Sequence, residues 1–150
     1  MESQNSEYIL VPGGLGYIGA HTVVELVKSH NEKVVIIDNL ENTSIICLDR
    51  INQITGMPDN IVFVEVDIRN YEEMEEKVFK QYSIKSVIHF AAFKSVGESV
   101  AKPLEYYSNN VQGSITLMRL LQKFGVKCMV FSSSCTVYGQ NAKAQEGDRI

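Results

Sequence analysis

The sequence predicts an α/β fold in which a doubly wound, mostly parallel sheet is flanked by helices. Two observations predict it. Short apolar runs alternate along the chain with stretches of helical period, as in strand–helix–strand units. The first apolar run leads directly into a glycine-rich turn that opens a helix, Pro12-Gly13-Gly14-Leu15-Gly16-Tyr17-Ile18-Gly19. This order is typical of a Rossmann-like sheet, whose ligands bind beyond the carboxyl ends of the strands.

Strands are expected at five short apolar runs. The first, Tyr8–Val11, precedes the glycine turn, and the second, Lys33–Asp38, ends on an acid. Three more are predicted at Ile61–Val66, Ser86–Phe90 and Lys127–Ser132. The fourth run is apolar enough to be buried on both faces of a parallel sheet. Right-handed crossovers are expected to join these strands.

Helices are expected between the strands, over about 17–29, 45–55, 71–82 and 103–124. The second should end before Gly56, and the last should begin at Pro103, a residue that suits the first turn of a helix. The last helix has apolar residues at helical spacing, namely Leu104, Tyr107, Val111, Ile115, Met118 and Leu121.

The glycine turn predicts a dinucleotide site. Gly13, Gly16 and Gly19 fit G-x-x-G-x-x-G, and Gly14, Gly16 and Gly19 fit G-x-G-x-x-G. Because glycine has no Cβ, the turn can be tight and its backbone can approach a pyrophosphate. The helix that follows directs free N–H groups and the positive end of its dipole at the anion.

An acidic residue at the end of the second strand indicates which dinucleotide binds. Asp38 lies about 20 positions after Gly19, where a carboxylate accepts a hydrogen bond from a ribose 2′-hydroxyl. The same carboxylate would repel the 2′-phosphate of NADP, so NAD is predicted. A plain glycine turn with a surface aspartate is the structural alternative.

Composition bounds the function. The chain has 150 residues, 45% of them hydrophobic, enough for one domain with its own core. A net charge of −4, with the basic residues scattered, argues against nucleic-acid or membrane partners. The histidines have no metal-ligand spacing, and the three cysteines, Cys47, Cys128 and Cys135, are widely spaced. With a polar N-terminus that lacks a secretory signal, this predicts a cytoplasmic protein with reduced thiols and no metal site.

At the predicted ligand edge the chain resembles the UDP-galactose (UDP-glucose) 4-epimerases of the extended short-chain dehydrogenase/reductase superfamily. The resemblance runs from about Tyr8 to Gly139. Its motifs are Gly13-Gly14-Leu15-Gly16-Tyr17-Ile18-Gly19, Asp38-Asn39-Leu40 with Asn42, Val66-Asp67-Ile68, the segment from His89 to Ser99, Pro103-Leu104-Glu105-Tyr106-Tyr107, Asn109-Asn110-Val111 and the segment from Phe131 to Gly139.

The resemblance implies an isomerase of galactose metabolism that keeps NAD bound and removes hydride from C4 of a UDP-hexose. The hydride then returns to the opposite face of a 4-keto intermediate. Ser134 matches a catalytic hydroxyl, Lys94 matches a nicotinamide-side lysine, and Asn109 matches a cofactor-side asparagine. Together with the glycines and Asp38, the predicted cofactor-binding residues are Gly13, Gly16, Tyr17, Ile18, Gly19, Asp38, Asn39, Asn42, Asp67, Ile68, Phe90, Ala91, Ala92, Lys94, Asn109 and Ser132.

Three of these assignments have plain structural alternatives. Lys94 taken alone suits an ordinary solvated lysine. The serines Ser132–Ser134 also suit the capping of backbone groups at a strand end. Tyr17 and Phe90 also suit ordinary packing. Asn109 and Asn110 are poor helix formers inside a predicted helix, which favours a functional role for at least one of them.

The chain departs from the family pattern in ways that limit the prediction. None of its seven tyrosines has a lysine four positions on, so the family's Tyr-x-x-x-Lys pair is missing. Pro12 stands where the family has Thr, Ala92 where it has Gly, and Cys135 where it has Ala. The expectation is therefore a truncated N-terminal NAD-binding domain, residues 1–150, without a substrate domain and inactive on its own.

Three hypotheses remain open from sequence. The chain is the N-terminal part of an epimerase that acts on a UDP-sugar, or a non-catalytic NAD-binding or partner-binding remnant. Alternatively it belongs to another sugar-nucleotide epimerase or dehydratase. A homodimer is possible, because the family commonly dimerises through two helices, of which only the one after Pro103 is in this chain.

Overall fold

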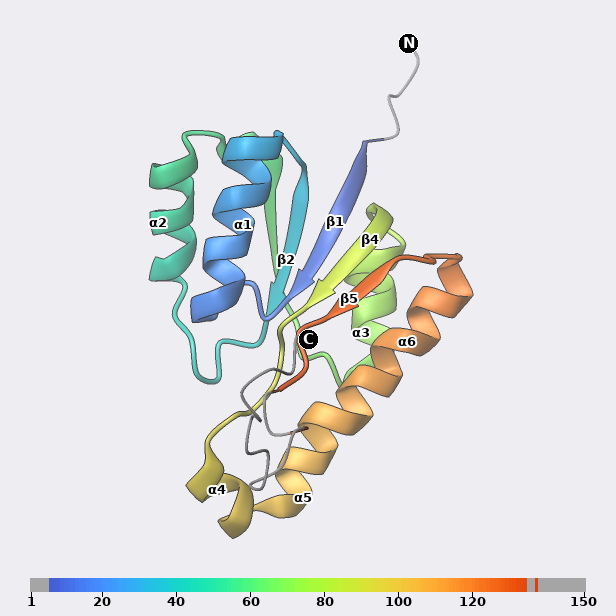
Figure 1. Ribbon diagram of the computed structural model, residues 1–150. Helices are drawn as coiled ribbons and strands as arrows, with labels where there is room; N and C mark the ends of the chain where they lie inside the picture. Colours follow the sequence, from blue (N-terminus) through green and yellow to red (C-terminus); the bar gives the residue numbers. More distant parts are fainter. Residues whose placement is uncertain (1–5, 135–136, 138–150) are drawn as a thin grey trace, which may run out of the picture.

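A five-stranded sheet forms the centre of the computed structural model, which describes residues 6–134 and 137 (Figure 1). The strands are β1 (Glu7–Pro12), β2 (Val34–Asp38), β3 (Ile61–Glu65), β4 (Ser83–His89) and β5 (Met129–Phe131). They lie in the order β3-β2-β1-β4-β5, and every pair is parallel. The predicted doubly wound α/β fold is confirmed.

The central strand β1 is where the chain changes direction across the sheet. Its residue Ile9 pairs with Val34 of β2, while Leu10 pairs with Val87 of β4. The chain therefore builds outward from β1 to β2 and β3, and then returns to the other side with β4 and β5. In such sheets a crevice opens at the carboxyl ends of the two strands on either side of this switch point.

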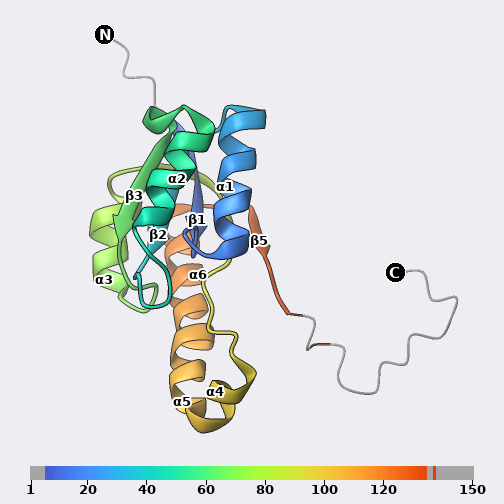
Figure 2. The same ribbon diagram turned by 90° about the vertical axis from the view of Figure 1, so that its left-hand side faces the viewer.

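Helices cover both faces of the sheet (Figure 2). One face carries α1 (Tyr17–His30) and α2 (Ile46–Thr55), and a single 3₁₀ turn, η1 (Pro58–Asn60), leads into β3. The other face carries α3 (Tyr71–Met74), which continues as the π-helical η2 (Glu75–Phe79), and a long helix. The long helix consists of α5 (Pro103–Tyr106), the π-helical η3 (Tyr107–Gln112) and α6 (Gly113–Phe124), and it is preceded by α4 (Val96–Ala101).

Each face has its own apolar cluster. Under α1 and α2, Val11, Ile36 and Val23 are fully buried. Under α3 and α6, Leu10, Met74 and Leu117 are fully buried. The alternation along β1 sends Ile9 and Val11 to one cluster and Leu10 to the other, which is why its apolar run is continuous.

The structure corrects several predicted elements. β4 begins at Ser83 rather than Ser86, and its Ile88 is only partly buried because α1 and α2 lie mainly over β1, β2 and β3 (Figure 1). α4 was not predicted, and the π-helical segments interrupt helices that were expected to be regular. Cys135 lies outside the described residues.

The last helix also buries a different side from the one that its apolar spacing suggested. Of the apolar positions named from sequence, only Leu121 is buried, and Leu104, Tyr107, Val111, Ile115 and Met118 are exposed. The core contacts come instead from Leu117, Leu120 and Leu121. The helix is thus apolar on two sides, one against the sheet and one facing solvent. Between residues 6 and 134, no helix is both long enough and apolar enough to cross a membrane.

Candidate functional site

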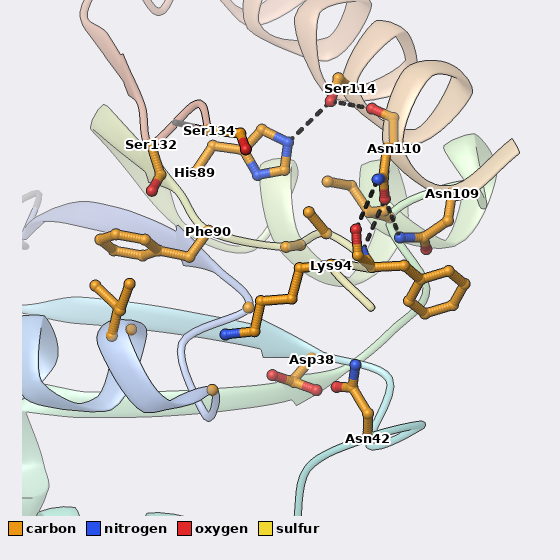
Figure 3. A pocket seen from close by; sticks show the side chains of 18 of the residues that line it. Asp38, Asn42, His89, Phe90, Lys94, Asn109, Asn110, Ser114, Ser132 and Ser134 are labelled. Carbon is orange, nitrogen blue, oxygen red and sulfur yellow. Dashed lines mark hydrogen bonds between the residues drawn. The ribbon is translucent and has the colours of Figure 1, made fainter. Parts of the chain in front are cut away.

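A cavity of about 1150 Å³ opens at the carboxyl ends of the strands (Figure 3). It is lined by the glycine turn, the ends of β2, β4 and β5, and the beginning of the long helix. All of the predicted site residues except Asp67 line it: Gly13, Gly16, Tyr17, Ile18, Gly19, Asp38, Asn39, Asn42, Ile68, Phe90, Ala91, Ala92, Lys94, Asn109, Ser132 and Ser134.

The glycine turn is packed too tightly for side chains. Gly13 has a φ of 75°, and its N–H donates to the Ile37 carbonyl at 2.8 Å. A Cβ on Gly13 would lie 2.6 Å from the backbone nitrogen of Ala91, and a Cβ on Gly19 would lie 2.3 Å from the Gly13 carbonyl oxygen. Both positions require glycine, because backbone atoms of the same crevice occupy the space that a side chain would need.

The start of α1 is prepared for an anion. Its N-cap, Gly16, has no side chain to bond the first N–H groups, and the first turn contains no acidic residue. The first N–H groups of a helix have no partner within the helix, and they lie at the positive end of the helix dipole. A phosphate in the cavity beside this turn would satisfy both the free donors and the dipole.

Asp38 ties the two loops on this side of the cavity together. It is only 8% exposed. Its carboxylate accepts hydrogen bonds from the N–H groups of Leu15 and Leu40, at 3.3 and 3.1 Å, and from the Thr43 hydroxyl at 2.8 Å. Leu40 adopts a left-handed φ of 58° to make this turn. Asp38 also lines the cavity, so its carboxylate can accept a hydrogen bond from a group placed there, and it disfavours a second negative group nearby.

Asp67 does not reach the main cavity. It lines a small hollow of about 170 Å³ next to it, together with Asn39, which borders both spaces. Arg69 holds the Asp67 carboxylate with its Nη2 atom at 2.5 Å, and this bonding lowers the pKa of Asp67. The predicted contact of Asp67 with a cofactor therefore stays a prediction.

The segment that follows β4, Phe90–Lys94, lines the cavity. The Phe90 N–H donates to the Pro12 carbonyl at 2.9 Å, which joins this segment to β1 although Pro12 has no N–H to donate in return. Lys94 is exposed, and its side chain extends across the cavity toward the side where Asp38 lies (Figure 3). Ala92 is also exposed, so its methyl group is not confined by the protein.

Sequence reasoning did not include several cavity residues on the opposite side. His89 is 1% exposed, its Nε2 lies 3.0 Å from the Ser114 hydroxyl oxygen, and its Nδ1 has no partner within residues 6–134. Burial lowers the pKa of His89 to about 4, so the ring is neutral. Ser114 donates to the Asn110 carbonyl at 2.6 Å and therefore accepts from the imidazole N–H.

Asn109 and Asn110 lie in the π-helical η3, where the predicted helix is locally wider. Asn109 is only 6% exposed, and both side chains line the cavity. The low helix propensity of the two asparagines indicated a functional role for at least one of them, but it did not say which. Asn110 bonds the backbone of Phe93, whereas Asn109 bonds Asn110.

The serines after β5 complete the cavity on its far side. The Ser132 N–H donates to the His89 carbonyl at 3.2 Å, and Ser133 has a left-handed φ of 58°. This turn brings Ser134 to the cavity wall. The catalytic part predicted for Ser134 stays a prediction.

The sequence of the chain is similar to those of known nucleotide-sugar enzymes. The family model described as GDP-mannose 4,6 dehydratase matches residues 10–148. The chain is 51% identical to a bifunctional protein GAL10 of Candida maltosa over 146 residues, covering 97% of this chain and 94% of that protein. It is also 51% identical to the UDP-glucose 4-epimerase of Bacillus subtilis over 131 residues, 87% of this chain but only 38% of that enzyme.

Solved structures give the same picture. The UDP-glucose 4-epimerase of Bifidobacterium longum, crystallised with NAD⁺ and UDP, superposes with a TM-score of 0.83 at 45% identity. The match covers 88% of this chain and 38% of that one. The UDP-glucose 4-epimerase of Thermus thermophilus, in complex with NAD, has a TM-score of 0.79 at 29% identity. The chain thus spans about two fifths of the length of these epimerases.

Proposed function

We propose, from the premise that this chain belongs to the GDP-mannose 4,6-dehydratase family and is a homologue of UDP-glucose 4-epimerases, that its cavity binds NAD. One observation carries the proposal. The glycine turn leaves no room for a Cβ at Gly13 or Gly19, and it opens a helix whose first N–H groups have no side-chain cap. A tight turn with free backbone donors at a helix start suits a pyrophosphate.

The cavity gives the cofactor a direction. The pyrophosphate belongs at the start of α1, and the adenosine ribose belongs at Asp38, whose buried carboxylate accepts hydrogen bonds. The nicotinamide half then extends to the other end, along Phe90–Lys94 and toward Ser134. A single cavity of about 1150 Å³ that joins these groups supports one extended dinucleotide.

The reaction proposed for the whole protein is epimerisation at C4 of a UDP-hexose. When bound, NAD would supply the acceptor for the hydride and return it to the sugar. Lys94 would place its ammonium on the nicotinamide side of the cofactor, and the Ser134 hydroxyl would help to orient the proton that passes from the sugar hydroxyl to the family's tyrosine. The sequence contains no Tyr-x-x-x-Lys pair, so we expect the 150-residue chain to bind NAD without epimerising sugars.

A homodimer through the long helix is part of the proposal. The solvent-facing side of α5, η3 and α6 presents Leu104, Tyr107, Val111, Ile115 and Met118, with Leu104 81% exposed. A continuous apolar stripe of this length, next to a second stripe already buried in the core, suits the same surface of a second copy.

The cytoplasm is the proposed location, because Cys47 and Cys128 are free thiols, which are usual in a reducing compartment.

Nucleotide binding tests the proposal. The chain is titrated with NAD and with NADP while its thermal unfolding is followed, and we expect NAD to raise the midpoint and NADP to do so less. The variant Asp38→Asn should narrow the difference between the two cofactors. Asp49→Asn, which removes an exposed acid of α2, is the matched control. Absence of any shift with NAD in the folded chain would contradict the proposed function.

A further inference from the structure

We infer that Asn110 is a positioning residue for the nicotinamide side of the cavity. It holds the backbone that precedes Lys94, and it fixes the orientation of the Asn109 amide. This inference rests on the proposed function for the identity of the ligand. Figure 3 shows the arrangement, with Asn110 between the long helix and the segment that carries Lys94.

Asn110 pairs with the backbone of Phe93 on both sides of the peptide. Its Oδ1 accepts from the Phe93 N–H at 2.8 Å, and its Nδ2 donates to the Phe93 carbonyl at 2.9 Å. These two partners can be satisfied only in one orientation of the amide, because an N–H needs an acceptor and a carbonyl needs a donor. The two hydrogen bonds therefore attach the segment after β4 firmly to the long helix.

The orientation of Asn109 follows from that of Asn110. The Asn109 Nδ2 lies 2.9 Å from the Asn110 Oδ1, an atom that can only accept. Asn109 must turn its NH₂ group toward Asn110, and its carbonyl oxygen is turned away. Because Asn109 is only 6% exposed and lines the cavity, a ligand there meets an amide of defined polarity.

The helix backbone around Asn110 is held as well. The Gly113 N–H donates to the Ser108 carbonyl, a π-helical bond, and the Ser114 hydroxyl donates to the Asn110 carbonyl. The Ser114 hydroxyl in turn accepts from the buried His89. In this π-helical turn the Asn110 carbonyl therefore accepts a side-chain hydrogen bond from Ser114, while the Asn110 side chain binds Phe93.

Lys94 depends on this arrangement more than its neighbours do. Across residues 6–134 its ammonium has no hydrogen-bond or ion-pair partner that would hold it in the cavity. Its position is therefore set by the backbone on either side: Phe93, which is bonded to Asn110, and Ser95, whose N–H donates to the Tyr106 hydroxyl at 3.1 Å. Loss of the Asn110–Phe93 pair would leave the Lys94 backbone held only by the single bond from Ser95 to Tyr106, and it would allow the Asn109 amide to rotate, without disturbing the glycine turn or Asp38.

Comparing two nucleotides tests this inference. NAD and ADP-ribose, which lacks the nicotinamide, are titrated by calorimetry against the wild-type chain, Asn110→Ala and Ser108→Ala. Ser108 lies in the same π-helical segment, and its hydroxyl bonds Gln112 outside the cavity. We expect Asn110→Ala to weaken NAD about tenfold and ADP-ribose less than about twofold, with Ser108→Ala unchanged. Equal weakening of both nucleotides, or no weakening of NAD, would overturn the inference.

Amide hydrogen exchange keeps the inference testable apart from the proposed function. In Asn110→Ala the Phe93 amide should exchange about tenfold faster, because it loses its acceptor. The Phe90 amide, which bonds the Pro12 carbonyl, should keep its wild-type rate. A wild-type chain that binds neither nucleotide would reject the proposed function alone. Unchanged exchange at Phe93 would reject the role of Asn110 in either case.

Discussion

The two ends of the cavity are built in different ways. At the glycine turn, backbone meets backbone, and a Cβ on Gly19 would lie 2.3 Å from a carbonyl oxygen. After the end of β4, the Asn110 side chain bonds the Phe93 backbone, and Lys94 is exposed. The first end has no spare volume, whereas the second depends on hydrogen bonds between residues far apart in the sequence.

This difference has a consequence for mutation. A substitution in the glycine turn meets a steric barrier that no side-chain rotation can relieve. A substitution around Asn110 removes hydrogen bonds that contribute about 1 kcal/mol each, so its effect is partial. We therefore expect substitutions in the glycine turn to abolish NAD binding and substitutions around Asn110 to weaken it only partly.

The largest effect is expected from Gly19→Ala. The new Cβ would overlap the Gly13 carbonyl, which cannot move freely because the Gly13 N–H is bonded to the Ile37 carbonyl. We expect a loss of stability of about 3 kcal/mol and NAD binding weakened more than about 100-fold. Urea unfolding and calorimetric titration measure both. Wild-type NAD affinity in this variant would contradict the steric overlap between the new Cβ and the Gly13 carbonyl.

The next effect concerns pH and the buried His89. Its pKa is about 4 in the folded chain, whereas an unfolded histidine titrates near 6.5. The unfolded state therefore binds a proton first as the pH falls, so stability is complete above about 6.5 and is lost between about 6.5 and 4. The loss can reach about 3 kcal/mol.

Urea unfolding of the wild type and of His89→Gln between pH 8 and pH 4.5 checks this expectation. The substitution should flatten the acid side of the stability profile, because glutamine does not titrate. The exposed His30 provides the matched control, His30→Gln. If His89→Gln and the wild type lose stability in parallel below pH 6.5, the neutral buried imidazole is not the cause.

A smaller effect is expected from Ser114→Ala. The substitution leaves the buried imidazole N–H without an acceptor and removes the donor to the Asn110 carbonyl. The expected cost is about 2 kcal/mol of stability, with NAD binding weakened less than in Asn110→Ala. Ser108→Ala is the control on the same helix. Equal stability of the two serine variants in urea would argue against the bond from His89.

The smallest effect is expected from Gly97→Ala, in the opposite direction. Apart from its chain neighbours and the backbone of its own helix, no atom of the described residues lies within 4 Å of the position that a Cβ on Gly97 would take, and the residue lies inside α4. Alanine should therefore stabilise the chain by about 0.5–1 kcal/mol through helix propensity. NAD affinity should not change. Comparison with Gly19→Ala separates the loss of glycine as such from the steric requirement of the turn.

Local sequence patterns predicted much of the fold correctly. They succeeded where a local structural constraint requires a particular type of residue. The apolar runs predicted the five strands that the structure describes. For β2 the reason is burial on both faces, whereas in the edge strand β5 the apolar Val130 and Phe131 are exposed. The glycine turn and Asp38 were expected to face one ligand crevice, and both line the cavity, because a tight turn and a strand-end acid are short-range features. Their contact with a pyrophosphate stays a prediction. The apolar spacing of the last helix did not reveal that it has two apolar sides, since spacing does not say which side meets the sheet.

The sequence by itself determined the parallel α/β sheet, the glycine turn and the set of polar residues at the strand ends, because these depend on neighbours within a few positions. Only the tertiary structure decided what those residues do to one another. It separated Asp67 from the main cavity by bonding it to Arg69, and it gave Asn109 and Asn110 different partners. Those contacts join segments that are distant along the chain, so no local pattern encodes them.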